Sequence, residues 1–545
     1  MLTQELEAIQ HRFGYLPTEE LKALSDRTHT PLYRIHGVIS FYPHFRLAPP
    51  SPVILRICRD ASCHLGGSNE LLAVLEETVA RAGLEGWDIR SVSCTGQCDG
   101  APAIRIGESS FRRVTLDRLA GYVETLASGR MPRRQPLRLR RDGAVIDPYD
   151  GVSQCDTARM FLQNGDPLTV VQTLKDSGLR GMGGAGFPTG TKWELVRNVE
   201  GTVKYVVCNA DESEPGTFKD RELLRFAPHL VLEGMILAGL VVGATSGYIF
   251  LRHEYERERE LLQRAIRRFY RQGFVGDDVL GSGRTFHVEI FDSPGGYICG
   301  EETALLEAME GKRAEPRNKP PFPGTHGLHG KPTLINNVET FAWIPSILLR
   351  GASWFKSQGI NGAAGRKYFA LSGHVCRPGV YEIPLGTSVR DLIERYGGGV
   401  SGGRKLKAFS PGGASSGFLP ASMADIPLDF APMAKAGSML GSGAVLAIAE
   451  GTDMVDLARN VTAFFRNESC GKCVPCRTGT EQLVRMVDRV LDGGANEQTL
   501  DIVPDLAETM GLTSICGLGQ AASLPVSSLL KYFPDEVKKH FCQHP

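Results

Sequence analysis

A set of cysteines near the C-terminal end constrains this chain more than any other feature. Cys470, Cys473 and Cys476 have C-x2-C-x2-C spacing, and Cys516 lies later in the segment Ser-Ile-Cys-Gly. Three closely spaced thiolates can hold one side of an iron–sulfur cube, whose fourth ligand often comes from elsewhere in the chain. The same pattern is unusual for zinc. The spacing therefore predicts a [4Fe–4S] cluster and one-electron transfer.

A second set of cysteines lies near the N-terminus. Cys58 and Cys63 are spaced C-x4-C, and Cys94 and Cys98 follow as C-x3-C after 30 intervening residues. Two pairs of thiolates suit a [2Fe–2S] cluster, in which each iron takes two protein sulfurs. A structural zinc site with four cysteines is the alternative, although its pairs are usually C-x2-C. The wider spacings favour [2Fe–2S].

Length and charge set the class of protein. At 545 residues the chain is too long for one core, so several domains are expected. Basic and acidic residues number 61 each, which gives no electrostatic case for nucleic acid or an anionic membrane. The N-terminal segment lacks a signal-peptide pattern, and the apolar stretch 234–250 is short for a membrane span and reads as a buried helix running into a strand. Thirteen cysteines then indicate metal ligation in a reducing, cytoplasmic compartment without direct membrane insertion.

Apolar periodicity predicts a multidomain α/β chain. Short helices are expected over 1–50, with Thr30 as the N-cap of one of them before Pro31. Strands and helices alternate over 53–128, and each cysteine pair follows a strand. A long α/β region extends to about 355, strand signals over 367–430 suggest a β-grasp-like module, and the pattern turns helical from Met439.

A glycine-rich loop is the second chemical signal. Its glycines are followed by Lys192 and a helical stretch. Glycines let a backbone approach a phosphate closely, and a lysine adds a point charge. The preceding segment, 168–174, has a helical rather than a strand pattern, so the loop is neither a P-loop nor a standard dinucleotide fingerprint. A nucleotide site is still expected here, on glycines Gly181, Gly183, Gly184, Gly186 and Gly190.

Three polar clusters accompany this loop. One follows the apolar strand 205–208, one follows a glycine pair, and one follows Leu334-Ile335. Ligands of open α/β sheets bind at the carboxyl ends of strands, and amides and carboxylates suit the many donors and acceptors of a flavin. Each cluster alone would read as a solvated loop. With two iron–sulfur motifs a flavin site is the economical interpretation, because a flavin converts hydride transfer into single-electron transfer. The clusters are Asn209, Asp211, Glu212 and Glu214; Tyr297, Gly300, Glu301 and Glu302; and Asn336 and Asn337.

These motifs closely resemble the NADH-oxidising diaphorase module shared by respiratory complex I, NAD-reducing hydrogenases and NAD-dependent formate dehydrogenases. The resemblance rests on the glycine-rich loop and on the strings Asn-Ala-Asp-Glu-Ser-Glu-Pro-Gly, Tyr-Ile-Cys-Gly-Glu-Glu, Lys-Pro-Pro-Phe-Pro, Asn-Asn-Val-Glu-Thr and Glu-Ser-Cys-Gly-Lys-Cys. It implies five parts: an N-terminal helical arm (1–50), a thioredoxin-like [2Fe–2S] domain (51–130), an FMN/NADH-binding α/β domain (140–360), a β-grasp, SLBB-like insert (365–435) and a helical [4Fe–4S] domain (439–545).

The resemblance also implies site residues. The four C-terminal cysteines would bind the cube, and NADH would lie over the flavin with its adenine near Phe187 and Phe322. Glu214, Glu302 and Lys319 would contact the rest of NADH, and the two glutamates are the expected catalytic-site carboxylates. No side chain need be a nucleophile or general base, since catalysis consists of stacking and orienting two rings. FMN would be held by the 181–190 loop, Lys192, Asn209, Asp211, Glu212, Tyr297, Gly300, Glu301, Asn336 and Asn337.

The segments 418–430 and 516–528 look most like fused β subunits of NAD-dependent formate dehydrogenases. This implies a separate molybdenum or tungsten subunit with further iron–sulfur clusters, from which electrons of formate would reach FMN and leave as hydride to NAD+. The alternatives are the diaphorase subunit of an NAD-reducing hydrogenase, a fused complex I subunit, and, in another class, a non-catalytic assembly protein that binds zinc.

Overall fold

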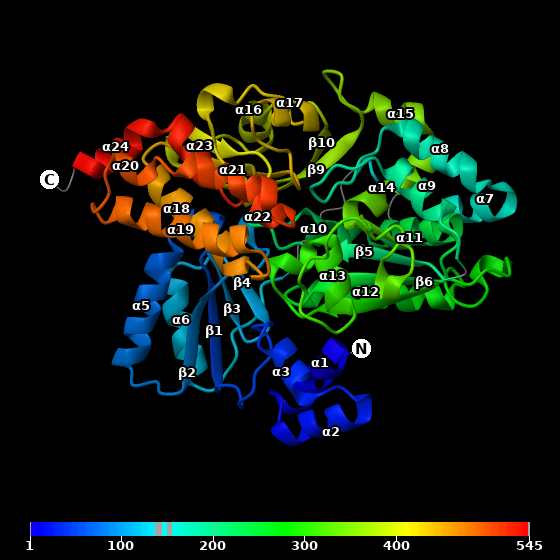
Figure 1. The fold of residues 1–545 in the computed structure, drawn as a ribbon, viewed down its shortest axis with the longest axis horizontal. Helices are drawn as coiled ribbons and strands as arrows, with labels where there is room; N and C mark the ends of the chain where they lie inside the picture. Colours follow the sequence, from blue (N-terminus) through cyan, green and yellow to red (C-terminus); the bar gives the residue numbers. More distant parts are fainter. Residues whose placement is uncertain (1, 137–143, 150–154, 202, 543–545) are drawn as a thin grey trace.

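The computed structural model describes residues 2–136, 144–149, 155–201 and 203–542. A helical arm, a small α/β domain, a larger α/β domain, a β-rich domain and a C-terminal helical region follow one another along the chain (Figure 1). This order confirms the predicted multidomain α/β class. The start expected for the FMN/NADH-binding domain, residue 140, lies outside the described residues.

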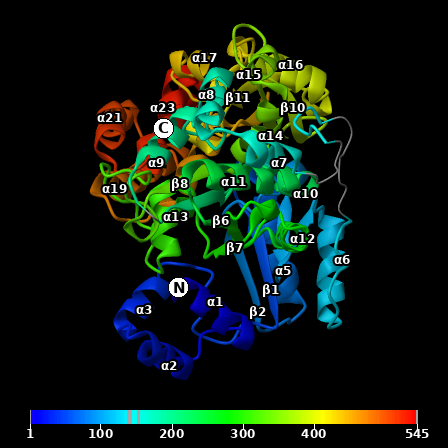
Figure 2. The ribbon, with the colours of Figure 1, turned by 90° about the vertical axis from the view of Figure 1, so that its right-hand side faces the viewer.

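The arm consists of α1 (Leu2–Phe13), α2 (Thr18–Thr28) and α3 (Leu32–Ile39). Its apolar faces close on one another, so Leu6 and Ile35 are buried. Tyr42 follows the arm and donates from its hydroxyl to the Lys312 carbonyl at 2.7 Å, which fixes the arm beneath the larger α/β domain (Figure 2). The expected N-cap was wrong by one residue: Pro31 occupies that position and makes no side-chain cap.

The small α/β domain has a four-stranded sheet in the order β2-β1-β3-β4. Strands β1 and β2 are parallel, and Cys58 at the end of β1 lies opposite Val92 at the end of β2. The loops that carry the two cysteine pairs therefore leave the sheet at the same edge. The sequence patterns missed two short elements, α4 and β4. The elements are β1 (Val53–Cys58), α4 (Ala61–Leu65), α5 (Ser68–Arg81), β2 (Trp87–Val92), β3 (Ala103–Ile106), β4 (Ser109–Arg112) and α6 (Leu116–Ala127).

The larger α/β domain contains a parallel sheet in the order β7-β6-β5-β8. Residue pairs Cys208–Asn336 and Asn209–Asn337 lie opposite each other on β5 and β8, so two of the polar clusters meet at one carboxyl edge. The strands are β5 (Tyr205–Ala210), β6 (Ser246–Arg252), β7 (His287–Ser293) and β8 (Thr333–Asn337). The helices are α7 (Asp156–Asn164), α8 (Pro167–Ser177), α9 (Thr189–Asn198), α10 (Lys219–Phe226), α11 (Pro228–Val242), α12 (Glu256–Arg271), α13 (Glu302–Met309), α14 (Val338–Arg350) and α15 (Ala352–Ser357).

Helix α11 is apolar on every side, and all of its residues after Pro228 are buried. It ends at Val242, and β6 follows, as expected for the stretch 234–250. Among the described residues no single helix is long and apolar enough to cross a membrane, although α10 and α11 pass that test as a pair bent by 93°.

The β-rich domain has a five-stranded sheet in the order β10-β9-β13-β11-β12. The expected helical onset at Met439 is wrong, because Ala444–Ala449 forms β13 between β9 and β11. That strand is apolar and buried along its whole length, and a short apolar run without alternation cannot be assigned by periodicity. The elements are β9 (Arg366–Gly373), β10 (Gly379–Pro384), α16 (Val389–Asp391), β11 (Leu406–Ser410), β12 (Leu419–Pro420), α17 (Phe430–Lys435) and β13.

The C-terminal region is helical from Met454 and lies against the small α/β domain (Figure 1). His64 Nε2 of α4 contacts the Asp456 carboxylate of α18 at 2.7 Å, and Asn460 donates to the Arg59 carbonyl at 2.9 Å. The helices are α18 (Met454–Glu468), α19 (Val474–Leu491), α20 (Glu497–Leu500), α21 (Val503–Thr513), α22 (Gly517–Ala521), α23 (Leu524–Tyr532) and α24 (Pro534–Cys542).

Candidate functional site

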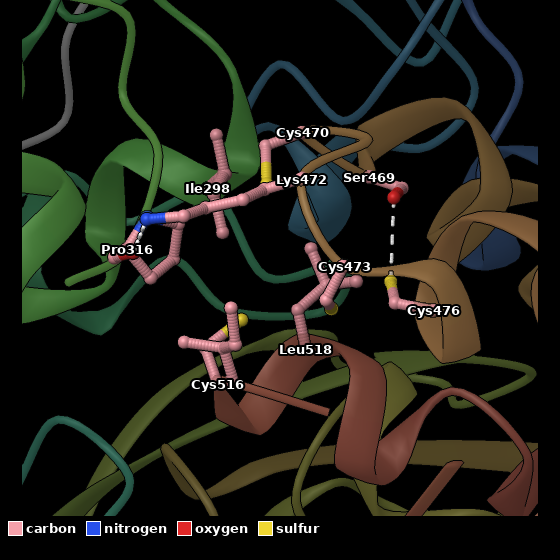
Figure 3. A pocket seen from close by; sticks show the side chains of 10 residues that line it. Ile298, Pro316, Ser469, Cys470, Lys472, Cys473, Cys476, Cys516 and Leu518 are labelled. Atoms are coloured by element: carbon pink, nitrogen blue, oxygen red, sulfur yellow. Dashed lines mark hydrogen bonds between the residues drawn. The ribbon is translucent and has the colours of Figure 1, made fainter. Parts of the chain in front are cut away.

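The four C-terminal cysteines line one small cavity, as Figure 3 shows. Cys470, Cys473 and Cys476 come from the α18–α19 connection and the first turn of α19, while Cys516 is the N-cap of α22. Ile298 and Leu518 are apolar parts of the wall. The structure thus brings together all four residues predicted to hold the cube.

The chemistry of this cavity suits an iron cluster. Burial raises the pKa of the Cys476 thiol to about 12 and that of Cys516 to about 11, so these sulfurs ionise only beside a strong positive charge. Irons would supply that charge. Lys472, a cation within the motif, donates to the Pro316 carbonyl at 2.7 Å. Four thiols in a wall that also holds Ile298, Pro316, Ile515 and Leu518 fit a [4Fe–4S] cluster.

The N-terminal cysteines also converge. Cys94 and Cys98 Sγ lie 3.4 Å apart. Hydrogen bonds with Cys63 and Cys94, together with burial, raise the pKa of Cys58 well above its usual range. Cys58 therefore contacts a cysteine of its own pair and one of the other pair. All four side chains are buried. Four thiols that hydrogen-bond to one another are placed so that two irons could replace their protons, as in a [2Fe–2S] cluster.

The glycine-rich loop connects α8 and α9 and is held closed by its own backbone. The Gly181 N–H donates to the Phe187 carbonyl at 2.8 Å. A Cβ at Gly183 would lie 3.0 Å from Asn337, and one at Gly190 would lie 2.6 Å from the Lys175 nitrogen. These positions therefore need glycine for close packing, and the loop lies against the end of β8.

The polar residues at the carboxyl ends of β5 and β8 differ in their hydrogen-bond partners. The Asn209 amide donates to the Gly300 carbonyl at 2.8 Å, and Asn336 accepts from the Trp193 indole at 3.0 Å. Asp211 Oδ1 is buried and has no hydrogen-bond partner among the described residues. Burial raises the pKa of Asp211 to about 7. An orphaned buried acceptor at the carboxyl edge of the sheet fits a ligand with hydrogen-bond donors, as a flavin has.

Glu212 faces into the protein. Its carboxylate accepts from the Asp220 and Arg221 backbone N–H groups at 2.8 and 3.0 Å and from the Tyr255 hydroxyl at 2.8 Å. It therefore caps helix α10, a structural contact that sequence reasoning did not foresee. Asn337 similarly accepts from the Glu339 N–H at 2.9 Å and caps α14.

Two glutamates and two lysines form a charged cluster. Glu302 binds Lys192 at 3.3 Å and Lys319 at 3.2 Å, and Glu301 binds Lys319 at 2.7 Å. Burial opposes ionisation of Glu302, but the two lysines outweigh it and lower the pKa of that carboxyl. Glu301 also accepts from the Ala304 N–H at 2.9 Å and caps α13. The cluster offers both cations and anions to a dinucleotide.

Glu214 and Tyr297 lie at the border with the β-rich domain. Glu214 accepts from the Ser415 N–H and hydroxyl at 2.8 and 2.7 Å, and the Tyr297 hydroxyl is 3.2 Å from Ser415 Oγ. Phe187 and Phe322 are 47% and 58% exposed, so both rings present a free face. The sequence patterns gave no sign of Ser415.

A buried ion network behind the loop was also missed. Lys367 of β9 donates to the Met182 carbonyl and to Glu339, both at 2.9 Å, and Lys219 binds Glu339 at 3.0 Å. Thr340 accepts from the Met182 N–H at 2.9 Å. The network fixes the loop to the β-rich domain. A lysine in a strand gives no sequence signal of burial, so only the structure could reveal it.

Comparison with known proteins agrees with this site. Residues 1–127 match the family model of the thioredoxin-like [2Fe–2S] ferredoxin and 174–346 that of the Nuo51 FMN-binding domain. Residues 368–419 match the SLBB domain, and 456–540 match the NADH-ubiquinone oxidoreductase-F iron–sulfur binding region. These matches confirm the predicted FMN, [2Fe–2S] and [4Fe–4S] domains and decide against zinc.

Relatives and solved structures extend the match. The second of the F subunits of NADH-quinone oxidoreductase in Rhizobium meliloti is 42% identical over 410 residues, 74% of this chain and 97% of that protein. The F subunit in Rickettsia felis is 43% identical over 385 residues, 70% of this chain and 91% of that protein. A chain in the crystal structure of an air-oxidized NAD+-reducing [NiFe]-hydrogenase superimposes with a TM-score of 0.88 at 31% identity, covering 98% of this chain and 93% of that one.

Fold and site together define an NADH oxidoreductase of the flavin and iron–sulfur type. The chain belongs to the family of the NADH-quinone oxidoreductase F subunits, with a thioredoxin-like [2Fe–2S] domain fused to the F-type part.

Proposed function

We propose that this chain is the diaphorase subunit of a multisubunit NAD+-reducing enzyme of the hydrogenase type. One observation carries the proposal. The hydrogenase chain aligns with 98% of this chain, whereas the two F-type relatives align with 74% and 70% of it. The hydrogenase chain thus also has a counterpart of the fused N-terminal part. A complex I-type assembly is the second candidate, supported by the higher identity of the F-type relatives.

The formate dehydrogenase prediction has less support. Neither the two F-type relatives nor the hydrogenase chain comes from a formate dehydrogenase. A molybdenum or tungsten partner, like a cytoplasmic location, therefore stays a prediction from the sequence resemblance alone.

Bound FMN would supply the exchange between hydride and single-electron transfer. In this proposal the chain's own residues bind and orient. The 181–190 loop and Lys192 receive the FMN phosphate, while Asp211 Oδ1 accepts a hydrogen bond from the flavin. The charged cluster of Glu302 and Lys319 orients the nicotinamide nucleotide, and Phe187 and Phe322 offer their exposed faces to its adenine.

Metal analysis of the native complex tests the branch. The complex is purified through a tag on this chain, its metals are measured, and NAD+ reduction is assayed with hydrogen and with formate. We expect nickel and hydrogen-dependent NAD+ reduction. Molybdenum or tungsten with formate-dependent reduction would replace this proposal with the formate dehydrogenase, and iron alone with quinone-dependent NADH oxidation would replace it with the complex I type.

A further inference from the structure

A cavity of about 550 Å³ lies where the arm, the thioredoxin-like domain, the FMN-binding domain and helix α18 meet. This volume is typical of small-molecule sites. Among the described residues that line it, none belongs to the set proposed for NADH, and Tyr297 is its one member of the set proposed for FMN. The cavity is therefore a site distinct from the nucleotide site.

The lining of this cavity is strongly basic. Seven arginines and three glutamates line it, an excess of four positive charges. Two acidic residues behind the lining, Asp88 and Glu315, lower this excess to two positive charges. Five of the arginines are in ion pairs: Arg56 and Arg90 with Asp88, Arg105 with Glu108, Arg252 with Glu254, and Arg313 with Glu315. Charges gathered in a cavity with protein walls attract an anion more strongly than charges spread over a surface.

Two arginines keep an unpartnered donor, and a third has no ion pair. The Nε atoms of Arg59 and Arg105 are buried, and neither has a hydrogen-bond partner in the described part of the chain. Arg46 forms no ion pair with any described residue. Arg46 follows the arm, Arg59 follows β1, and Arg105 lies in β3, so the three side chains approach from separate segments. Buried guanidinium donors without partners are costly unless a ligand satisfies them.

We propose that this cavity binds a phosphate-bearing small anion of up to nucleotide size. The planar fork of arginine matches the oxygens of phosphate in bidentate geometry. Arg46, Arg59 and Arg105 reach the cavity from separate segments, and three guanidinium groups suit a ligand with several negative charges. Arg90 marks the opening of the cavity to solvent, because its side chain lines the cavity and is 71% exposed.

The position of the cavity suggests what a bound anion does. Cys94 of the [2Fe–2S] set and Cys470 of the [4Fe–4S] set both line it. A bound anion adds negative charge beside both sites and disfavours adding an electron to either cluster. Its binding lowers both reduction potentials. This link to the clusters rests on the proposed function, whereas the binding itself does not.

Calorimetric titration of the cofactor-loaded chain with inorganic pyrophosphate tests the site. Saturating NAD+ is present to keep the nucleotide site filled. We expect one pyrophosphate per chain and at least tenfold weaker binding in Arg46→Gln and in Arg59→Gln. Arg264→Gln is the matched control, because this arginine is exposed on α12 and pairs with Glu260 outside the cavity. The Arg264→Gln variant should bind pyrophosphate as tightly as the unchanged chain.

Absence of saturable binding at millimolar pyrophosphate would overturn the proposal. Binding by both cavity variants as tight as that of the unchanged chain would overturn it as well. Iron and flavin content checks that each variant is intact. Arg59 is next to Cys58, so Arg59→Gln could lose iron. In that case the test rests on Arg46→Gln, because Arg46 lies outside the thioredoxin-like domain. In electron paramagnetic resonance titrations of the intact chain, pyrophosphate should lower the potentials of both clusters, and unchanged potentials despite binding would refute the electrostatic link alone.

Discussion

Glu468 joins the two segments that carry the predicted cluster ligands. Its carboxylate accepts a hydrogen bond from the Ser93 hydroxyl, 375 residues away in the sequence, and another from the Tyr297 N–H at 2.7 Å. Ser93 directly precedes Cys94, and Cys470 follows Glu468 by two positions. One side chain thus ties the thioredoxin-like domain to the helical region and to the FMN-binding domain.

Replacing Glu468 should loosen this junction. Glu468→Ala removes the acceptor for two part-buried donors, which costs about 1–3 kcal/mol for each donor left unsatisfied. We expect a lower melting temperature and reduced iron content. Glu481→Ala, which removes an exposed pair with Arg485 on α19, is the control and should change stability by less than about 0.5 kcal/mol. Equal melting of the two variants would show that the Glu468 contacts contribute nothing.

The cube ligands can be tested by removing one thiol. Cys473→Ala should abolish the [4Fe–4S] signal in electron paramagnetic resonance and leave FMN content unchanged, because the cysteine lines the cluster cavity and none of the FMN set does so. Cys376→Ala is the control, since Cys376 is exposed and lies in neither cysteine set. An intact cube signal in Cys473→Ala would remove this residue from the ligand set.

The sequence was sufficient for the parts of the site that local pattern encodes. Cysteine spacing predicted both clusters, and strand signals placed Cys58 at the end of β1 and Cys94 after β2. Contacts between distant segments could not be predicted in this way. The bond between Ser93 and Glu468 and the burial of Lys367 depend on how domains pack, and neither residue type signals its partner.

Strand β13 shows the same limit at the level of secondary structure. Its six buried apolar residues carry neither a two-residue nor a 3.6-residue period, so neighbours in the sheet decide its conformation. Glu212 is the corresponding case in the site, because a carboxylate after a strand fits a ligand contact and a helix cap equally well. The structure shows the cap.

Glu302→Gln should affect NADH kinetics more than flavin content. The change removes the negative charge that binds Lys192 at 3.3 Å and Lys319 at 3.2 Å. Both lysines are then free to reorient, and the nucleotide is no longer held in one orientation. A ten- to hundredfold lower kcat/KM, about 1.4–2.8 kcal/mol, is expected with an artificial acceptor. Glu289→Gln, exposed on β7, is the control. Unchanged turnover in Glu302→Gln would contradict the role.

The glycine-rich loop can be tested by one substitution and a matched control. In Gly190→Ala the new Cβ would lie 2.6 Å from the Lys175 nitrogen, so α8 and α9 must separate. In Gly121→Ala on α6, outside the FMN set, no atom lies within 4 Å of the new Cβ. We expect FMN content to fall in Gly190→Ala and to persist in Gly121→Ala, with iron content unchanged in both. Equal flavin content would show that the loop geometry at Gly190 does not matter for binding.

Glu233 should make stability depend on pH. Burial raises the pKa of this α11 carboxyl to about 7, against about 4.3 in an unfolded chain. The folded state therefore holds a proton that the unfolded state releases, and the free energy of unfolding falls as pH rises between these values. The amide that replaces the carboxyl in Glu233→Gln carries no charge, so this variant should be more stable than the unchanged chain at pH 8, by up to about 4 kcal/mol.

At pH 5 the advantage of Glu233→Gln should shrink or reverse. The protonated acid already resembles the amide, and the hydrogen bonds that Glu233 accepts from the Tyr149 hydroxyl and the Ala158 N–H, both at 3.1 Å, are then made without a buried charge. Thermal unfolding of both proteins at pH 5, 6, 7 and 8 measures the difference, and Glu289→Gln again serves as the control. A difference in stability that stayed constant across this range would mean that Glu233 has the same pKa in the folded and the unfolded chain. Burial would then not raise the pKa of Glu233.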